Sequence, residues 1–120
     1  MDSYDVFISY SRLDTEVADT VCRAFDRAGI KYFIDRVGIS GGATFSDELA
    51  DAIDGSTLML FLASANSYAS KWTIDEIHYA KTEKPLGSII PYIIDGTPLP
   101  KALKLALASC NQRNMVDHPV

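Results

Sequence analysis

The run of apolar residues between Ser56 and Ser64, STLMLFLAS, restricts the fold of this chain more than any other stretch. A half-buried strand alternates apolar and polar residues, whereas this run has no polar face. Strands that are covered on both faces are typical of parallel sheets, because the connections between parallel strands carry helices across both sides. The run therefore predicts a central strand in an α/β domain.

Four other strand-like runs alternate with helical patterns along the chain. The strands are expected at Tyr4–Ser9, Lys31–Asp35, Ser88–Asp95 and Asn114–Val116. The helices are expected from the turn-spaced residues Val17, Val21, Phe25 and Ala28 up to Gly29, from the capping pair Thr44 and Asp47 to Gly55, from the N-cap Ser70 to Glu83, and over Lys101–Ala108. This order predicts a flavodoxin-like three-layer α/β fold, with a central five-stranded parallel sheet and helices on both faces.

Two details of this pattern are specific enough to check. Pro91 lies inside the fourth expected strand, and a proline there predicts a bulge or an edge position because it lacks the N–H that a ladder needs. The stretch between Ser64 and Ser70 is expected to be a loop.

Length and charge narrow the classes of function. A chain of 120 residues forms one domain, 1–120, and its net charge of -5 attracts neither nucleic acid nor an anionic membrane. No apolar run is long enough to span a bilayer and no signal peptide precedes Arg12, so a cytoplasmic location is expected. Cys22 and Cys110 lack a CxxC partner and are expected to be reduced thiols. A final covering helix is missing after the fifth strand, so the domain is expected to come from a longer protein or to be capped by a partner.

Ligands of open parallel sheets bind beyond the carboxyl ends of the strands. Here those ends are Ser9–Arg12, Asp35–Arg36 with the glycine-rich loop that follows, and Ser64–Trp72. The chain has no GxxxxGK[ST] or GxGxxG motif, and Ser64 stands where a receiver domain needs an aspartate. Its two histidines do not form a metal-binding pattern, so no metal is expected, and His78 is expected at the surface.

One charged residue lies on a face of the Ser70–Glu83 helix that is expected to be buried. At about 100° per residue, Glu76 falls about 40° from Trp72, on the same side as Ile77 and Ala80. Buried carboxylates are rarely left unpaired, so a nearby lysine or arginine is one explanation. The other is a catalytic carboxylate beside an aromatic wall. The spacing alone leaves both open.

Three segments resemble the signature segments of TIR (Toll/interleukin-1 receptor/resistance) domains: DVFISYSRLD, YFID and SKWTIDEI. The resemblance covers nearly the whole chain in order. The loop DRVGISGGATF lacks the Arg-Asp and Pro-Gly pattern of animal receptors and is more similar to bacterial and plant members. Many such domains cleave NAD+ at the nicotinamide–ribose bond with a glutamate four residues after an aromatic position. That pairing corresponds to Trp72 and Glu76.

The resemblance implies an NAD+ hydrolase or cyclase with Glu76 as the catalytic residue and NAD+ as substrate, without a further cofactor. The substrate-binding residues expected with it are Trp72, Tyr10, Ser11, Arg12, Asp35, Arg36, Gly41, Gly42 and Phe45. For the arginines a solvated surface charge is an equal alternative, and for Tyr10 and Ser11 so is ordinary turn packing. Trp72 has core packing as its alternative, the glycine loop a flexible connector, and Asp35 a local turn cap. Either ADP-ribose or a cyclic isomer is the expected product, in bacterial defence or interference with a host.

The resemblance also implies association with other TIR domains, through the loop 36–44, into a homo-oligomer that completes the site. The competing hypothesis is an interaction module without enzymatic activity, which acts in signalling through TIR–TIR contacts alone.

Overall fold

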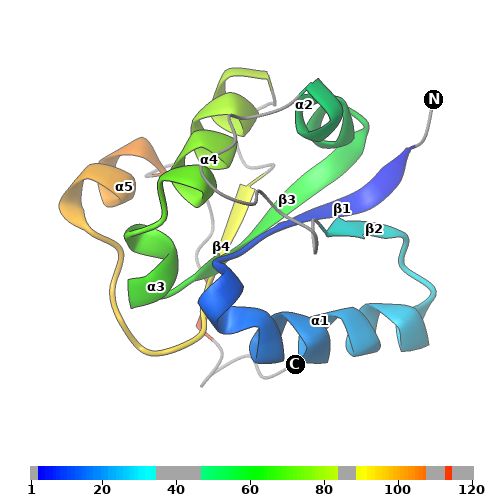
Figure 1. The fold of residues 1–120 in the computed structure, drawn as a ribbon, viewed down its shortest axis with the longest axis horizontal. Helices are drawn as coiled ribbons and strands as arrows, with labels where there is room; N and C mark the ends of the chain where they lie inside the picture. Colours follow the sequence, from blue (N-terminus) through cyan, green and yellow to red (C-terminus); the bar gives the residue numbers. More distant parts are fainter. Residues whose placement is uncertain (1–2, 35–46, 84–88, 108–112, 115–120) are drawn as a thin grey trace.

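A computed structural model of the chain describes residues 3–34, 47–83, 89–107 and 113–114 (Figure 1). Its elements are β1 (Tyr4–Ser9), the 3-10 turn η1 (Arg12–Asp14), α1 (Thr15–Ala28), β2 (Tyr32–Ile34), α2 (Asp47–Asp54), β3 (Ser56–Ala63), α3 (Ala65–Tyr68), α4 (Lys71–Glu83), β4 (Ile89–Ile93), α5 (Lys101–Ala106) and β5 (Arg113–Asn114). The five strands form one sheet in the order β2-β1-β3-β4-β5, and every neighbouring pair is parallel. The apolar run that begins at Ser56 is the middle strand, as predicted.

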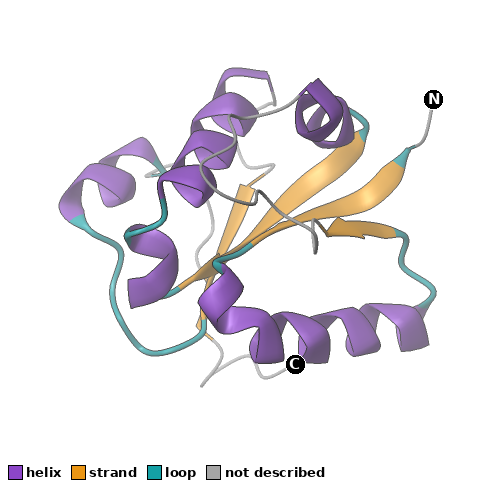
Figure 2. Cartoon of the chain, in the orientation of Figure 1, coloured by secondary structure: helices purple, strands orange, loops and turns teal. Residues whose placement is uncertain are grey.

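Helices cover both faces of the sheet and bury two separate apolar clusters (Figure 2). One cluster lies under α1 and includes Val6, Ile8, Ala18, Val21, Cys22, Leu62 and Tyr92. The other lies under α2, α4 and α5 and includes Phe7, Ile53, Met59, Phe61, Ile77, Ala80, Ile93 and Leu103. Successive residues of a strand point to opposite faces, so Val6 and Ile8 of β1 belong to the first cluster and Phe7 to the second. This confirms the three-layer flavodoxin-like fold.

The helix boundaries follow local signals in the sequence. Gly29 ends α1 with a φ of 72°, a left-handed conformation that suits glycine, and its N–H donates to the carbonyls of Asp26 and Phe25. The hydroxyl of Ser70 accepts a hydrogen bond of 3.3 Å from the backbone N–H of Thr73, so Ser70 caps α4 as predicted.

The stretch after β3 is not a plain loop. Residues Ala65–Tyr68 form α3, and Ser64 caps this short helix through a reciprocal capping box with Ser67. A capping box normally pairs serine or threonine with glutamate or glutamine, and here two serines make the same exchange, which is why the pattern was missed.

Pro91 occupies neither a bulge nor an edge strand, contrary to the prediction. It pairs in regular register with Phe61, and β4 lies between β3 and β5. The N–H of Ile94 donates to the carbonyl of Ala63 on β3. Because N–H directions alternate along a strand, the nitrogen of Pro91 faces the β5 side, where the described pairs begin only at Tyr92. The missing N–H of Pro91 therefore removes no hydrogen bond between β3 and β4.

Several sequence expectations fall outside the described residues: the loop 36–43, the capping residue Thr44, Cys110 and the strand beyond Asn114. None of the helices in the described ranges has the length and apolarity that crossing a bilayer requires.

Candidate active site

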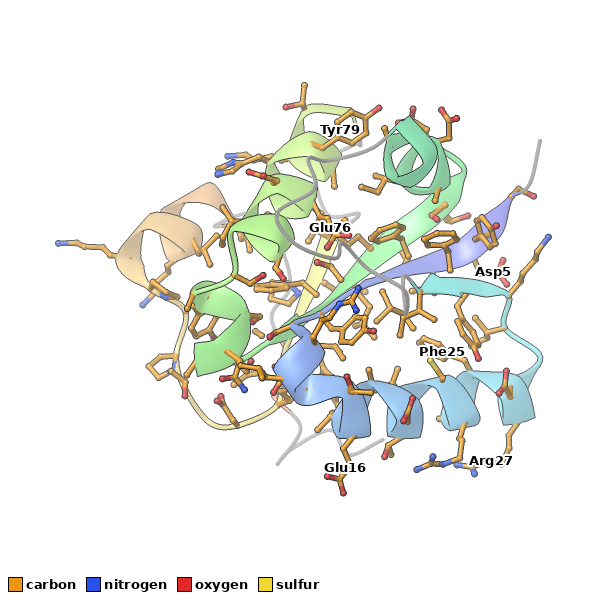
Figure 3. All side chains as sticks on the ribbon, in the orientation of Figure 1. Asp5, Glu16, Phe25, Arg27, Glu76 and Tyr79 are labelled. Atoms are coloured by element: carbon orange, nitrogen blue, oxygen red, sulfur yellow. The ribbon has the colours of Figure 1, made fainter. Side chains whose placement is uncertain are left out.

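The centre of the candidate site is a buried contact between β1 and α4. The hydroxyl of Ser9, the last residue of β1, donates a hydrogen bond of 2.8 Å to Oε1 of Glu76. Glu76 is 3% exposed and Ser9 is 0% exposed, so the bond lies away from solvent. In Figure 3 the Glu76 side chain extends from α4 toward the strands. The structure thus gives this carboxylate a hydroxyl partner, Ser9, which the spacing alone did not indicate.

The helical phase of α4 agrees with the wheel drawn from the sequence. Ile77 and Ala80 are fully buried on the side of Glu76, whereas Asp75 is half-buried and His78 is exposed. Thr73 shares the buried side one turn before Glu76, and its Oγ1 has no hydrogen-bond partner within the part of the chain that the structure describes. The first two turns of α4 therefore present a carboxylate and, among the described residues, an unsatisfied hydroxyl to the interior.

A second polar contact joins the turn after β1 to the end of β3. Asp14 accepts hydrogen bonds from the hydroxyl of Ser64 at 2.5 Å and from the side-chain amide of Asn66 at 2.9 Å. Charge-assisted bonds of this kind are stronger than neutral ones. This contact, which we call the Asp14 clamp, fixes η1 relative to the start of α3.

The end of β4 is tied to the same edge of the sheet. The carboxylate of Asp95 accepts hydrogen bonds of 3.0 Å from the backbone N–H groups of Ala65 and Thr97. Partial burial tends to raise the pKa of Asp95, but these backbone hydrogen bonds outweigh it and lower that pKa. The phenol of Tyr68 donates to the carbonyl of Thr97 at 2.7 Å. Burial, aided by the charge of Asp95, raises the pKa of Tyr68 to about 12.

Three of the expected substrate-binding residues lie in or next to the turn after β1. Ser11 caps η1 by accepting a hydrogen bond from the N–H of Leu13, and Arg12 is exposed. Tyr10 packs in the cluster under α1, on the other face of the sheet from Glu76. Trp72 lies in α4, one turn before Glu76, and its side chain is outside the described part. Asp35, Arg36, Gly41, Gly42 and Phe45 also lie outside it.

Ser9 was absent from the expected site residues, although strand alternation contains the signal. Phe7 faces α4 and Ser9 is two residues further on, so it faces the same way. The described residues contain no group of three or more His, Cys, Asp or Glu side chains able to hold a metal ion. The chemistry that this arrangement offers is that of a single oriented carboxylate.

Comparison with known proteins identifies the family. The family model for the TIR domain matches residues 6–118. This chain belongs to the TIR domain family. The fold agrees: the TIR domain of the Toll-related receptor TRR-2 from Hydra magnipapillata superposes with a TM-score of 0.76 at 24% identity, covering 97% of this chain and 87% of that one.

Two other relatives concern function. The NAD(+) hydrolase ApTIR of Actinoplanes sp. is 28% identical over 102 residues, which cover 78% of this TIR domain and 14% of that protein. The TIR domains in the structure of the activated Roq1 resistosome, which recognises the pathogen effector XopQ, are 30% identical with a TM-score of 0.65, covering 80% of this chain and 60% of that one. The TIR domain spans between 7% and 14% of the length of the curated relatives that it matches.

Proposed function

We propose that this TIR domain is an NAD+ hydrolase that cleaves the nicotinamide–ribose bond, with Glu76 as the catalytic carboxylate. The observation that carries the proposal is the position of Glu76: it is buried on the sheet-facing side of α4 and bonded to the carboxyl end of β1. Ligands of parallel α/β sheets bind at this edge. A relative that is named an NAD(+) hydrolase supports the same activity.

The reaction suits one carboxylate. The bond between ribose C1′ and the pyridinium nitrogen breaks with its electron pair going to nicotinamide, which leaves as a neutral ring and needs no general acid. The ribose then carries oxocarbenium character, and the ionised carboxylate of Glu76 stabilises that positive charge. Water adds to C1′ and loses a proton, giving ADP-ribose. Attack by a hydroxyl or the adenine of the same molecule gives a cyclic isomer instead.

The remaining site residues complete this proposal. Trp72 packs against the nicotinamide or ribose, and Arg12 with Arg36 meets the diphosphate through charge-assisted hydrogen bonds. Ser11, Asp35, Gly41, Gly42 and Phe45 line the substrate path. Tyr10 supports the turn from the α1 side, where it packs.

Association of several copies is part of the proposed mechanism. Because Glu76 is 3% exposed, the ribose reaches its carboxylate only after the site opens. We propose that contact between TIR domains, through the loop 36–44, promotes this opening in the cytoplasm during a defence response or interference with a host. The resistosome relative supports assembly of TIR domains.

The test compares nicotinamide release from concentrated protein for wild type and Glu76→Gln, which keeps the shape of the side chain and removes its charge. We expect release to fall at least about 100-fold, because removal of one group that stabilises transition-state charge typically lowers the rate by this factor. Asp75→Asn is the matched control, because it removes the same charge one position earlier on a different side of the helix, and it should retain activity. Chromatography of the products separates ADP-ribose from a cyclic isomer.

The second candidate function is a TIR–TIR interaction module without enzymatic activity, which the resistosome relative favours. Equal nicotinamide release from wild type and Glu76→Gln, under conditions where sedimentation shows assembly, would support the module and overturn the hydrolase.

A further inference from the structure

Ser9 is placed by the strand rather than by the turn that follows it. It is the last residue of β1 and pairs in register with Phe61 of β3, so its backbone belongs to the ladder between these two strands. Its side chain points to the same face of the sheet as the side chain of Phe7, toward α4, and none of its surface is exposed. The strand therefore sets the position of the Ser9 backbone and the face of the sheet to which its hydroxyl points.

The carboxylate that it meets has more freedom. A glutamate side chain has three rotatable bonds, and Glu76 reaches the sheet from a separate element, 67 residues further along the chain. A buried carboxylate needs hydrogen bonds in place of water, and the 2.8 Å bond to the Ser9 hydroxyl supplies one to Oε1. Removal of this donor takes one hydrogen bond from Oε1 and weakens the restraint on the rotamer of the carboxylate.

We propose that Ser9 is a positioning residue that holds the Glu76 carboxylate in the orientation the substrate meets. This inference rests on the proposed function of Glu76 and adds the residue that directs it. Ser9 transfers no proton and forms no covalent bond in the reaction. It acts by keeping one carboxylate oxygen occupied and the plane of the carboxylate fixed, because small misplacements of a catalytic group are costly.

The kinetic test uses Ser9→Ala and Ser9→Cys. We expect Ser9→Ala to lower kcat about tenfold while KM stays within about twofold, since a charge-assisted hydrogen bond accounts for roughly one power of ten. Ser9→Cys, which keeps a weak donor, should lie between wild type and Ser9→Ala. A side chain that only fills space would not produce this order.

Ser56→Ala is the matched control. Ser56 is also a buried serine of the central sheet, with its hydroxyl donating to the carbonyl of Ala52 at 2.7 Å, but it lies at the opposite end of β3 from the site. Each alanine variant loses one buried serine hydroxyl and its hydrogen bond, so an effect of general destabilisation would appear in both activities. An equal kcat for Ser9→Ala and Ser56→Ala would overturn the proposal.

A second measurement does not depend on activity. A double-mutant cycle of Ser9→Ala and Glu76→Ala is measured by urea unfolding. The change in the unfolding equilibrium constant of the double variant should differ by about tenfold from the product of the two single changes. A deviation below about twofold means that the hydroxyl does not hold the carboxylate, and the proposal fails whatever the kinetics show.

The two proposals fail in different ways. If Glu76→Gln releases nicotinamide as fast as wild type, the hydrolase proposal fails and the positioning role falls with it. If Glu76→Gln is inactive while Ser9→Ala matches the Ser56→Ala control, only the positioning role fails.

Discussion

At the scale of single residues, two neighbours on one turn of α4 differ in how their polar atoms are satisfied. The Glu76 carboxylate bonds to Ser9, whereas Thr73 Oγ1 has no hydrogen-bond partner among the described residues. Both side chains are buried. A buried hydroxyl that gains no hydrogen bond keeps the cost of leaving water, so we expect Thr73 to lower stability where it stands.

The isosteric change Thr73→Val tests this cost. We expect it to raise the free energy of unfolding by about 1 kcal/mol, because it removes an unsatisfied polar atom and keeps the volume. Urea unfolding measures the change, with Thr82→Val on the exposed side of α4 as the control. A loss of stability would show that Thr73 makes a hydrogen bond in solution.

At the scale of elements, polar side chains hold the loops together at the carboxyl edge of the sheet. The Asp14 clamp ties η1 to α3, and Asp95 ties the end of β4 to the same short helix. These contacts join residues 14 and 95 to residues 64–66, and no local pattern connects these three parts of the chain. They fix the turn that carries Ser11 and Arg12 relative to the rest of the sheet edge.

The change Asp14→Ala removes the acceptor of both clamp bonds. We expect the free energy of unfolding to fall by about 1–3 kcal/mol, since the Ser64 hydroxyl and the Asn66 amide lose a charged partner. Glu16→Ala, at an exposed carboxylate two residues later, should change it by no more than about 0.5 kcal/mol. Chemical denaturation of both variants measures the difference, and equal effects would contradict the clamp.

At the scale of the whole molecule, stability depends on pH through groups on different elements. The pKa of Tyr68 is raised to about 12 by burial and by the charge of Asp95. The pKa of Tyr32 is also raised to about 12, by burial and by its hydrogen bond to Asp26. A pKa above the unfolded value of about 10 means that folding favours the neutral phenol. Its contribution is complete below pH 10 and is lost as the pH rises toward 12.

We therefore expect stability to fall between about pH 10 and pH 12, and to fall less steeply in Tyr68→Phe, which has no proton to lose. Urea unfolding at pH 8 and at pH 11.5 measures this difference. An identical fall in both proteins would show that Tyr68 titrates alike in the folded and unfolded states.

The local pattern of the sequence determined which segments form the sheet and its helices. Apolar continuity predicted β3, helical spacing predicted α1 and α4, and Gly29 and Ser70 marked their ends, because these signals depend only on residues a few positions apart. The same periodicity predicts the buried side of α4, and Glu76 lies on that side.

Only the tertiary structure decided what Glu76 meets. Its bond to Ser9 joins residues 67 positions apart, and it exists because a parallel sheet brings the end of β1 beneath α4. The effect of Pro91 and the Asp14 clamp depend in the same way on which strands become neighbours. Strand order and register determine which distant residues form hydrogen bonds. The periodicity of a single segment gives no information about strand order or register.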